Sequence, residues 1–141
     1  AVICNWNANG YRLPTEAEWE WLARGGQNYT YAGSDTIDGV AWYTENTNTT
    51  GTREVKTKAP NGYGLYDMSG NVWEWCWDWY VRDISDSTPA DGAASGSYRV
   101  LRGGSWDCDY WFCSVTSRTA TFPDCVVDPY TTGFRVVRQA N

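Results

Sequence analysis

The sequence has 141 residues, ten of them tryptophan and none histidine, and its net charge is −6. The length fits a single domain, residues 1–141. Its acidic surface would repel nucleic acid. No apolar run reaches the ~20 residues that span a bilayer. The lack of histidine excludes Ser-His-Asp triads, Cys-His nucleophile pairs and His-ligated metal sites.

The first residues indicate an interrupted beginning. The chain opens with AVICNW and has no initiator Met, so we expect an amino-terminal part of the protein to be missing. We expect the residues before Asn9 to be the tail of an earlier helix.

The clearest helix is predicted in the segment PTEAEWEWLARGG. Thr15 and Glu18 form a capping-box signature, in which each side chain satisfies a backbone donor at the helix start. Trp19 and Ala23 recur at helical spacing and are expected to face the core. Gly25 then supplies the left-handed residue at which many helices end.

Residues 27–58 are polar and rich in Thr, Asn and Gly, which predicts loops around one or two short strands. The four residues VAWY, numbered 40–43, are expected to anchor these loops to the core.

The segment NVWEWCWDWY predicts a strand, because four tryptophans alternate with Glu74, Cys76 and Asp78. The indoles then lie on one face and the polar groups on the other. Residues 98–101 and 134–137 are short β-rich runs beside glycine, which favours adjacent strands of one antiparallel sheet.

Five cysteines are present, an odd number without a CxxC motif, so we expect mostly reduced thiols rather than a disulfide framework.

Four segments occur in an informative order: YRLPTEAEWEWLARGG, APNGYGLYDMSGNVWEWCWDWY, RVLRGGSW and GFRVV. Together they resemble the formylglycine-generating-enzyme, or sulfatase-modifying-factor, family. The resemblance implies an α+β, C-type-lectin-like fold with little regular secondary structure, a small antiparallel sheet and one or two helices. It does not settle the function, because the family contains both enzymes and binding proteins.

The enzymes of this family oxidise a cysteine of sulfatases, using two active-site cysteines that hold copper(I). Cys108 and Cys113 have the matching spacing after GGS, and soft thiolates suit copper(I). The basic and aromatic run that follows in the enzymes is replaced here by SVTSRTATFPDC. We therefore expect no catalysis and no cofactor, and the copper-dependent oxidase with Cys108 and Cys113 remains an alternative.

Calcium is a second implication of the resemblance, which places oxygen ligands at Asn71 and Glu74. The alternative for Glu74 is that it belongs, with Asp78, to the solvent-exposed face of the tryptophan strand.

The stretch between GGSW and GFRVV, residues 107–132, has neither helical nor strand periodicity and mixes aromatic with small polar residues, as antibody paratopes do. It also resembles the variable region of proteins diversified by retroelements. In these systems the adenines of a template repeat are copied with errors, so that the Asn codons AAC and AAT change. Such changes never produce Lys, Glu, Gln or Met, and this stretch contains none of the four. We therefore interpret 107–132 as a variable ligand-binding segment.

The candidate contact residues are Asp107, Cys108, Asp109, Tyr110, Ser117, Thr119, Thr121, Phe122, Asp124, Cys125, Asp128 and Tyr130. Arg118 and Pro123 are assigned to the scaffold. Trp111 is either a fixed position or derived from another codon, because no Asn codon reaches Trp by such copying. The resemblance implies a bacterial cell-surface or exported protein whose partner is a variable protein or a cell-surface ligand. A plain adhesion or structural module is the third reading.

Overall fold

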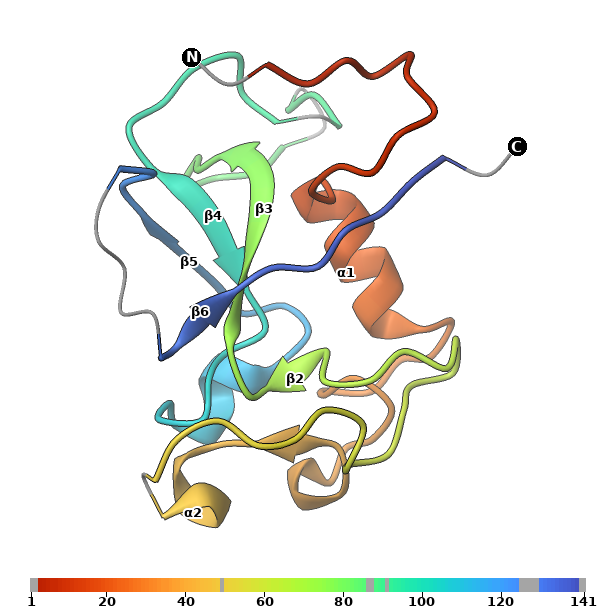
Figure 1. The fold of residues 1–141 in the computed structure, drawn as a ribbon, viewed down its shortest axis with the longest axis vertical. Helices are drawn as coiled ribbons and strands as arrows, with labels where there is room; N and C mark the ends of the chain where they lie inside the picture. The colour runs from red at the N-terminus through yellow and green to blue at the C-terminus, as the bar shows by residue number, and fades with distance from the viewer. Residues whose placement is uncertain (1–2, 49, 86–87, 91, 125–129, 140–141) are drawn as a thin grey trace.

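The computed structural model describes residues 3–48, 50–85, 88–90, 92–124 and 130–139. Short helices and strands are joined by long loops around one sheet and one main helix (Figure 1). The predicted α+β class with little regular secondary structure is confirmed. None of the helices in these ranges has the length and apolar character to cross a bilayer.

The main helix, α1 (Glu16–Arg24), begins and ends as the sequence predicts. The Thr15 hydroxyl accepts a hydrogen bond from the Glu18 amide at 3.1 Å, and the Glu18 carboxylate accepts one from the Thr15 amide at 2.8 Å. Gly25 ends the helix at φ 58°, where a Cβ would come within 2.7 Å of Asn61. Trp19 and Ala23 are fully buried, as expected.

The larger sheet has the strand order β5 (Arg118–Thr121), β4 (Arg99–Arg102), β3 (Trp73–Trp79) and β6 (Thr132–Gly133). The first three strands are antiparallel neighbours, but β6 runs parallel to β3. The sheet is therefore mixed, whereas an antiparallel one was expected.

Residues 134–137, predicted as a strand of the same sheet, form only an isolated bridge from Val137 to Arg12. They leave the sheet where the side chain of Arg135 binds Glu74 of β3. The strand prediction for this segment is wrong.

A smaller, parallel pair joins β1 (Ala41–Trp42) to β2 (Ser69–Gly70). It is flanked by the 3-10 helix η1 (Ile37–Gly39), by α2 (Thr44–Thr47) and by a second 3-10 helix, η2 (Tyr110–Cys113). Val40, Ala41 and Tyr43 are buried, so the predicted anchor of the polar loops is confirmed.

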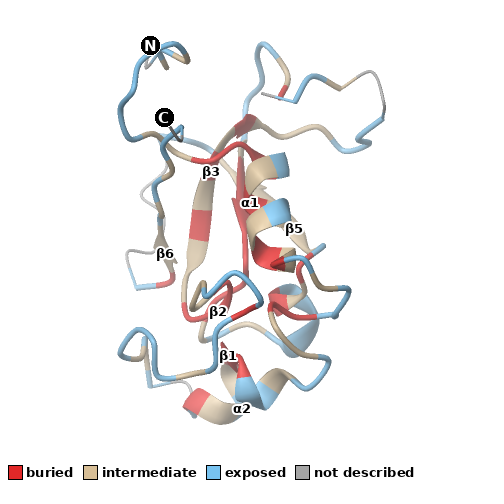
Figure 2. Ribbon diagram, turned by 90° about the vertical axis from the view of Figure 1, so that its right-hand side faces the viewer, coloured by how far each residue is buried: buried red, intermediate tan, exposed pale blue. Residues whose placement is uncertain are grey.

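The period-two pattern of β3 is confirmed, but its buried face is the polar one. Glu74, Cys76 and Asp78 are each at most 6% exposed, whereas the four indoles are half-buried. Figure 2 shows the buried residues gathered between α1 and the sheet. Glu74 and Asp78 therefore do not lie on a solvent-exposed face. Hydrogen bonds and ion pairs from other segments replace the water that these carboxylates lose on burial.

The amino-terminal expectation is also corrected. Residues 3–9 form turns rather than the tail of a helix, with the Ala8 amide donating to the Asn5 carbonyl. Trp6 packs edge-on against Trp77 at 5.9 Å, and the Arg12 guanidinium lies 4.7 Å from the Trp6 ring. These contacts hold the segment against the sheet.

Charged groups join α1 to the sheet. Arg102 of β4 is fully buried, and its guanidinium binds the carboxylates of Glu16 and Glu20 and the Ser117 carbonyl. Arg118 of β5 makes a two-bonded pair with Glu16, at 2.5 and 2.7 Å. Arg102, Arg118, Glu16 and Glu20 are called the ionic core below.

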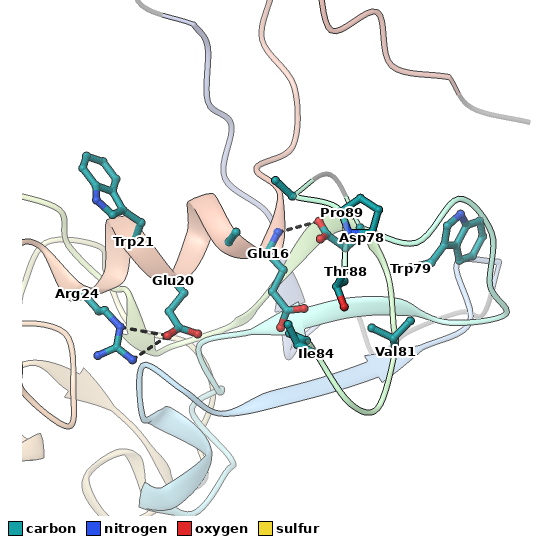
Figure 3. Close-up of a pocket in the computed structure, with 13 residues that line it drawn as sticks. Glu16, Glu20, Trp21, Arg24, Asp78, Trp79, Val81, Ile84, Thr88 and Pro89 are labelled. Atoms are coloured by element: carbon teal, nitrogen blue, oxygen red, sulfur yellow. Dashed lines mark hydrogen bonds and ion pairs between the residues drawn. The ribbon is translucent and has the colours of Figure 1, made fainter. Parts of the chain in front are cut away.

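The Asp78 carboxylate of β3 accepts a hydrogen bond from the Glu16 backbone amide at 2.7 Å (Figure 3). This bond satisfies one of the amide donors that have no partner within the helix at the start of α1. Beside it, Glu16, Glu20 and Asp78 line a cavity of about 430 Å³. Figure 3 also shows the pair between Arg24 and Glu20 on the exposed side of the helix.

We predict that Arg102→Ala destabilises the protein by about 3–5 kcal/mol, because it removes a fully buried guanidinium that joins Glu16 and Glu20 of α1 to the Ser117 carbonyl. Arg24→Ala removes a half-exposed pair with Glu20 and should cost less than about 1 kcal/mol. Urea unfolding followed by tryptophan fluorescence measures both changes. Equal losses for the two variants would contradict the proposed importance of the ionic core.

Candidate ligand-binding surface

Residues 107–132 are fixed to the rest of the molecule at several points besides the ladder between β5 and β4. The Cys108 carbonyl accepts from the Thr44 amide, and the Val115 amide donates to the Thr30 carbonyl at 2.9 Å. Cys113 is fully buried against Gly104, where a Cβ would come within 2.8 Å of its sulfur. The segment is therefore an anchored part of the fold, and substitutions at its anchors would be felt by the core.

The predicted contact residues lie at the surface. Every one that the structure describes is exposed or half-buried, while Cys113 and Val115 between them are buried. The exposed residues are Asp107, Asp109, Tyr110, Phe122, Asp124 and Tyr130, and the half-buried ones are Cys108, Ser117, Thr119 and Thr121. Cys125 and Asp128 lie outside the described residues.

These residues do not form one compact patch. Residues 107–113 lie beside β2, and β5 runs from there to the opposite end of the sheet (Figure 1). Thr119 and Thr121 pair with β4, and Phe122 packs on Tyr98 at 4.4 Å beyond the strand. The segment thus offers a strip along one edge of the sheet, with an aromatic group at each end.

Arg118 belongs to the scaffold, as predicted, through its pair with Glu16. Pro123 is exposed and lines a cavity of about 460 Å³ whose other walls include Trp75, Trp77 and Arg99.

Sequence reasoning missed Phe112 and gave Trp111 no role in binding. Both are exposed, at 38% and 52%. The available signal was the run of three aromatic residues, Tyr110 to Phe112, which lacks a pattern that would bury it.

The copper alternative depends on Cys108 and Cys113, and the two thiols differ in burial. Burial raises the pKa of the Cys113 thiol to about 12, and the nearby Cys108 adds to the shift. A metal-ligating cysteine must be a thiolate, which is costly in this interior site. Cys108 is half-buried, with its sulfur 3.1 Å from the Ser105 hydroxyl. Across the described ranges, no three Cys, Asp or Glu residues are grouped so as to hold a metal ion, so a copper site here would rest on the two cysteines alone.

Among the described residues, Cys76 and Cys113 are buried and Cys4 and Cys108 are half-buried, and none of the four is in a disulfide. Cys125 lies outside the described residues.

The two calcium candidates have protein partners. Arg135 binds both oxygens of Glu74, at 2.5 and 2.6 Å, and the Trp19 indole donates to the same carboxylate at 2.6 Å. The Asn71 side chain accepts from the Arg53 amide and donates to the Arg53 carbonyl. Both side chains thus have structural roles, and a calcium ion would compete with Arg135 for Glu74.

Comparisons with known proteins agree with this architecture. Residues 2–140 match the family model described as "Sulfatase-modifying factor enzyme 1-like domain". A formylglycine-generating enzyme of Thermomonospora curvata is 42% identical over 152 residues, which covers 85% of this chain and 50% of the relative.

Two solved structures have the same fold. "Treponema denticola variable protein 1" matches with a TM-score of 0.85 and 47% identity, over 94% of this chain and 49% of that one. PvdO from Pseudomonas aeruginosa matches with a TM-score of 0.77 and 30% identity, over 92% and 53%. The chain thus spans about half the length of these relatives.

We predict that a calcium chelator leaves the melting temperature unchanged, because Arg135 already neutralises Glu74. Glu74→Gln should lower the melting temperature equally with and without chelator. A chelator effect in the wild type that disappears in Glu74→Gln would instead place calcium at this position.

Proposed function

The chain belongs to the sulfatase-modifying factor enzyme 1-like domain family, and on that premise we propose that it is a non-catalytic ligand-binding module. Residues 107–132 supply a sequence-variable surface, diversified by a retroelement, on a tryptophan-rich scaffold.

One observation carries the proposal: anchoring and exposed side chains alternate within the same segment. Cys113, Val115 and Arg118 hold the chain in place through burial or ion pairing. Thr119 and Thr121 follow Arg118 on the edge strand β5 and are half-buried. Among the described strands, β5 pairs only with β4. Side chains at such positions can change at little cost, which is the property that a diversified surface requires.

The similarity to a variable protein of Treponema denticola, at 47% identity, supports this reading. By analogy we place the protein at the bacterial cell surface or among exported proteins, with a variable protein or cell-surface ligand as its partner. A net charge of −6 disfavours nucleic acid as that partner.

A copper-dependent formylglycine-generating oxidase is the second candidate, and the 42% identity to such an enzyme favours it. The buried, high-pKa thiol of Cys113 argues against it. A plain adhesion module is compatible with the exposed aromatic side chains but does not account for the composition of residues 107–132.

We predict that Ser117, Thr119 and Thr121 tolerate exchange among Ser, Thr, Asn, Asp and Tyr within about 0.5 kcal/mol of unfolding free energy. Arg118→Ala should cost several times more, because Glu16 loses its two-bonded partner. Chemical denaturation of a small variant set tests this. Comparable losses at Thr119 and Arg118 would contradict a tolerant surface.

The corresponding genomic observation is a near-identical template repeat that differs mainly at adenines and lies beside a reverse-transcriptase gene. Absence of both from the source genome would remove the retroelement part of the proposal.

The oxidase alternative predicts tight copper(I) binding and conversion of a Cys-x-Pro-x-Arg peptide, both lost in Cys113→Ser. We expect neither activity in the wild type, because Cys113 is neutral and inaccessible. Competition with a copper(I) chelator and mass spectrometry of the peptide measure the two. Turnover that requires Cys113 would establish the enzyme and overturn the binding module.

A further inference from the structure

Tyr110, Trp111 and Phe112 form an exposed group at one end of the variable segment, here called the aromatic ridge. Their exposed fractions are 46%, 52% and 38%, although three consecutive aromatic residues would normally be drawn into a core. A contiguous apolar surface of this kind marks a contact site more often than isolated exposed residues do.

The ridge is held in a fixed orientation. It forms the first three residues of η2, whose fourth residue, Cys113, is fully buried. The Phe112 ring meets Trp73 of β3 edge-on at 6.1 Å, and Trp111 contacts Tyr110 at 4.9 Å and Phe112 at 5.9 Å. A rigid aromatic side chain loses little conformational entropy when a partner packs on it, which favours its use as an anchor.

The surroundings of the ridge are acidic. Asp107 and Asp109 are exposed and directly precede the ridge in the chain, and no ion pair that the structure shows within the described ranges involves either of them. One oxygen of Asp107 accepts hydrogen bonds from the Ser105 hydroxyl and the Cys108 thiol, which leaves its second oxygen for a partner. The negative charge around the ridge is therefore available to a partner.

We propose that the aromatic ridge binds a lysine or arginine side chain of a protein partner, which packs on Trp111 and is attracted by the carboxylates of Asp107 and Asp109 just before the ridge in the chain. The inference rests on the proposed function, because it names the partner chemistry of the same surface. A cation over an indole face gains both from the ring quadrupole and from apolar contact with its aliphatic stem. The two carboxylates add charge complementarity, which guides the encounter and selects for a basic partner.

Short random peptides displayed on phage and selected on the immobilised full chain provide the probe. We expect the selected peptides to contain Lys or Arg beside an apolar residue. Affinity of the synthesised peptides, measured by fluorescence anisotropy, should fall at least about tenfold in Trp111→Ala, as for an anchor residue at an interface. Replacing the peptide's basic residue by Gln should have a similar effect.

The double variant Asp107→Asn/Asp109→Asn should weaken binding severalfold at low ionic strength and less at high salt, because rim charges are screened. Trp21→Ala and Asp83→Asn are matched controls, because Trp21 is 62% exposed on α1 and Asp83 is exposed. Neither control should change affinity. Each variant is first checked for an unchanged melting temperature.

The outcomes separate this inference from the function on which it rests. Peptides that require Thr119 or Phe122 but bind Trp111→Ala normally would refute the ridge and leave the binding module standing. Peptides that need Trp111 but are acidic or neutral, or neutral glycans that compete for it, would refute the basic partner. If all selected peptides bind independently of residues 107–132, both proposals fail.

Discussion

The burial of Arg102 between α1 and the sheet is the constraint on which the rest of the structure depends. A fully buried guanidinium is tolerable only with carboxylates at hand, and Glu16 and Glu20 supply them from one face of the helix. Arg118 of β5 binds the same Glu16, so this ion pair joins β5 directly to α1. The ladder joins β5 to β4 as well. Helix and sheet are thus held in one relative position.

This arrangement separates stability from recognition within a single segment. Residues 107–132 contribute Cys113, Val115 and Arg118 to the interior, so their path is determined by the scaffold. The side chains between these anchors are exposed or half-buried, so their exchange should cost the fold little. The same burial that fixes the path raises the pKa of the Cys113 thiol to about 12.

The acidic composition and the ionic core are connected. Arg12, Arg24, Arg102, Arg118 and Arg135 are all engaged in ion pairs with Glu16, Glu18, Glu20 or Glu74. These five arginines are therefore neutralised within the scaffold, and the protein as a whole carries a net charge of −6. Exposed aspartates such as Asp107 and Asp109 keep that excess charge next to the aromatic ridge.

The sequence by itself determined the local features: the capped helix from Glu16, its end at Gly25 and the alternation of β3. The sequence also identified the family and the surface segment, because short motifs and the local composition of residues 107–132 are enough to recognise them. Only the tertiary structure decided which face of β3 is buried, where residues 134–137 run and that Trp111 is exposed. A period of two defines two faces without choosing between them, and the choice here depends on Arg135, 61 residues from Glu74.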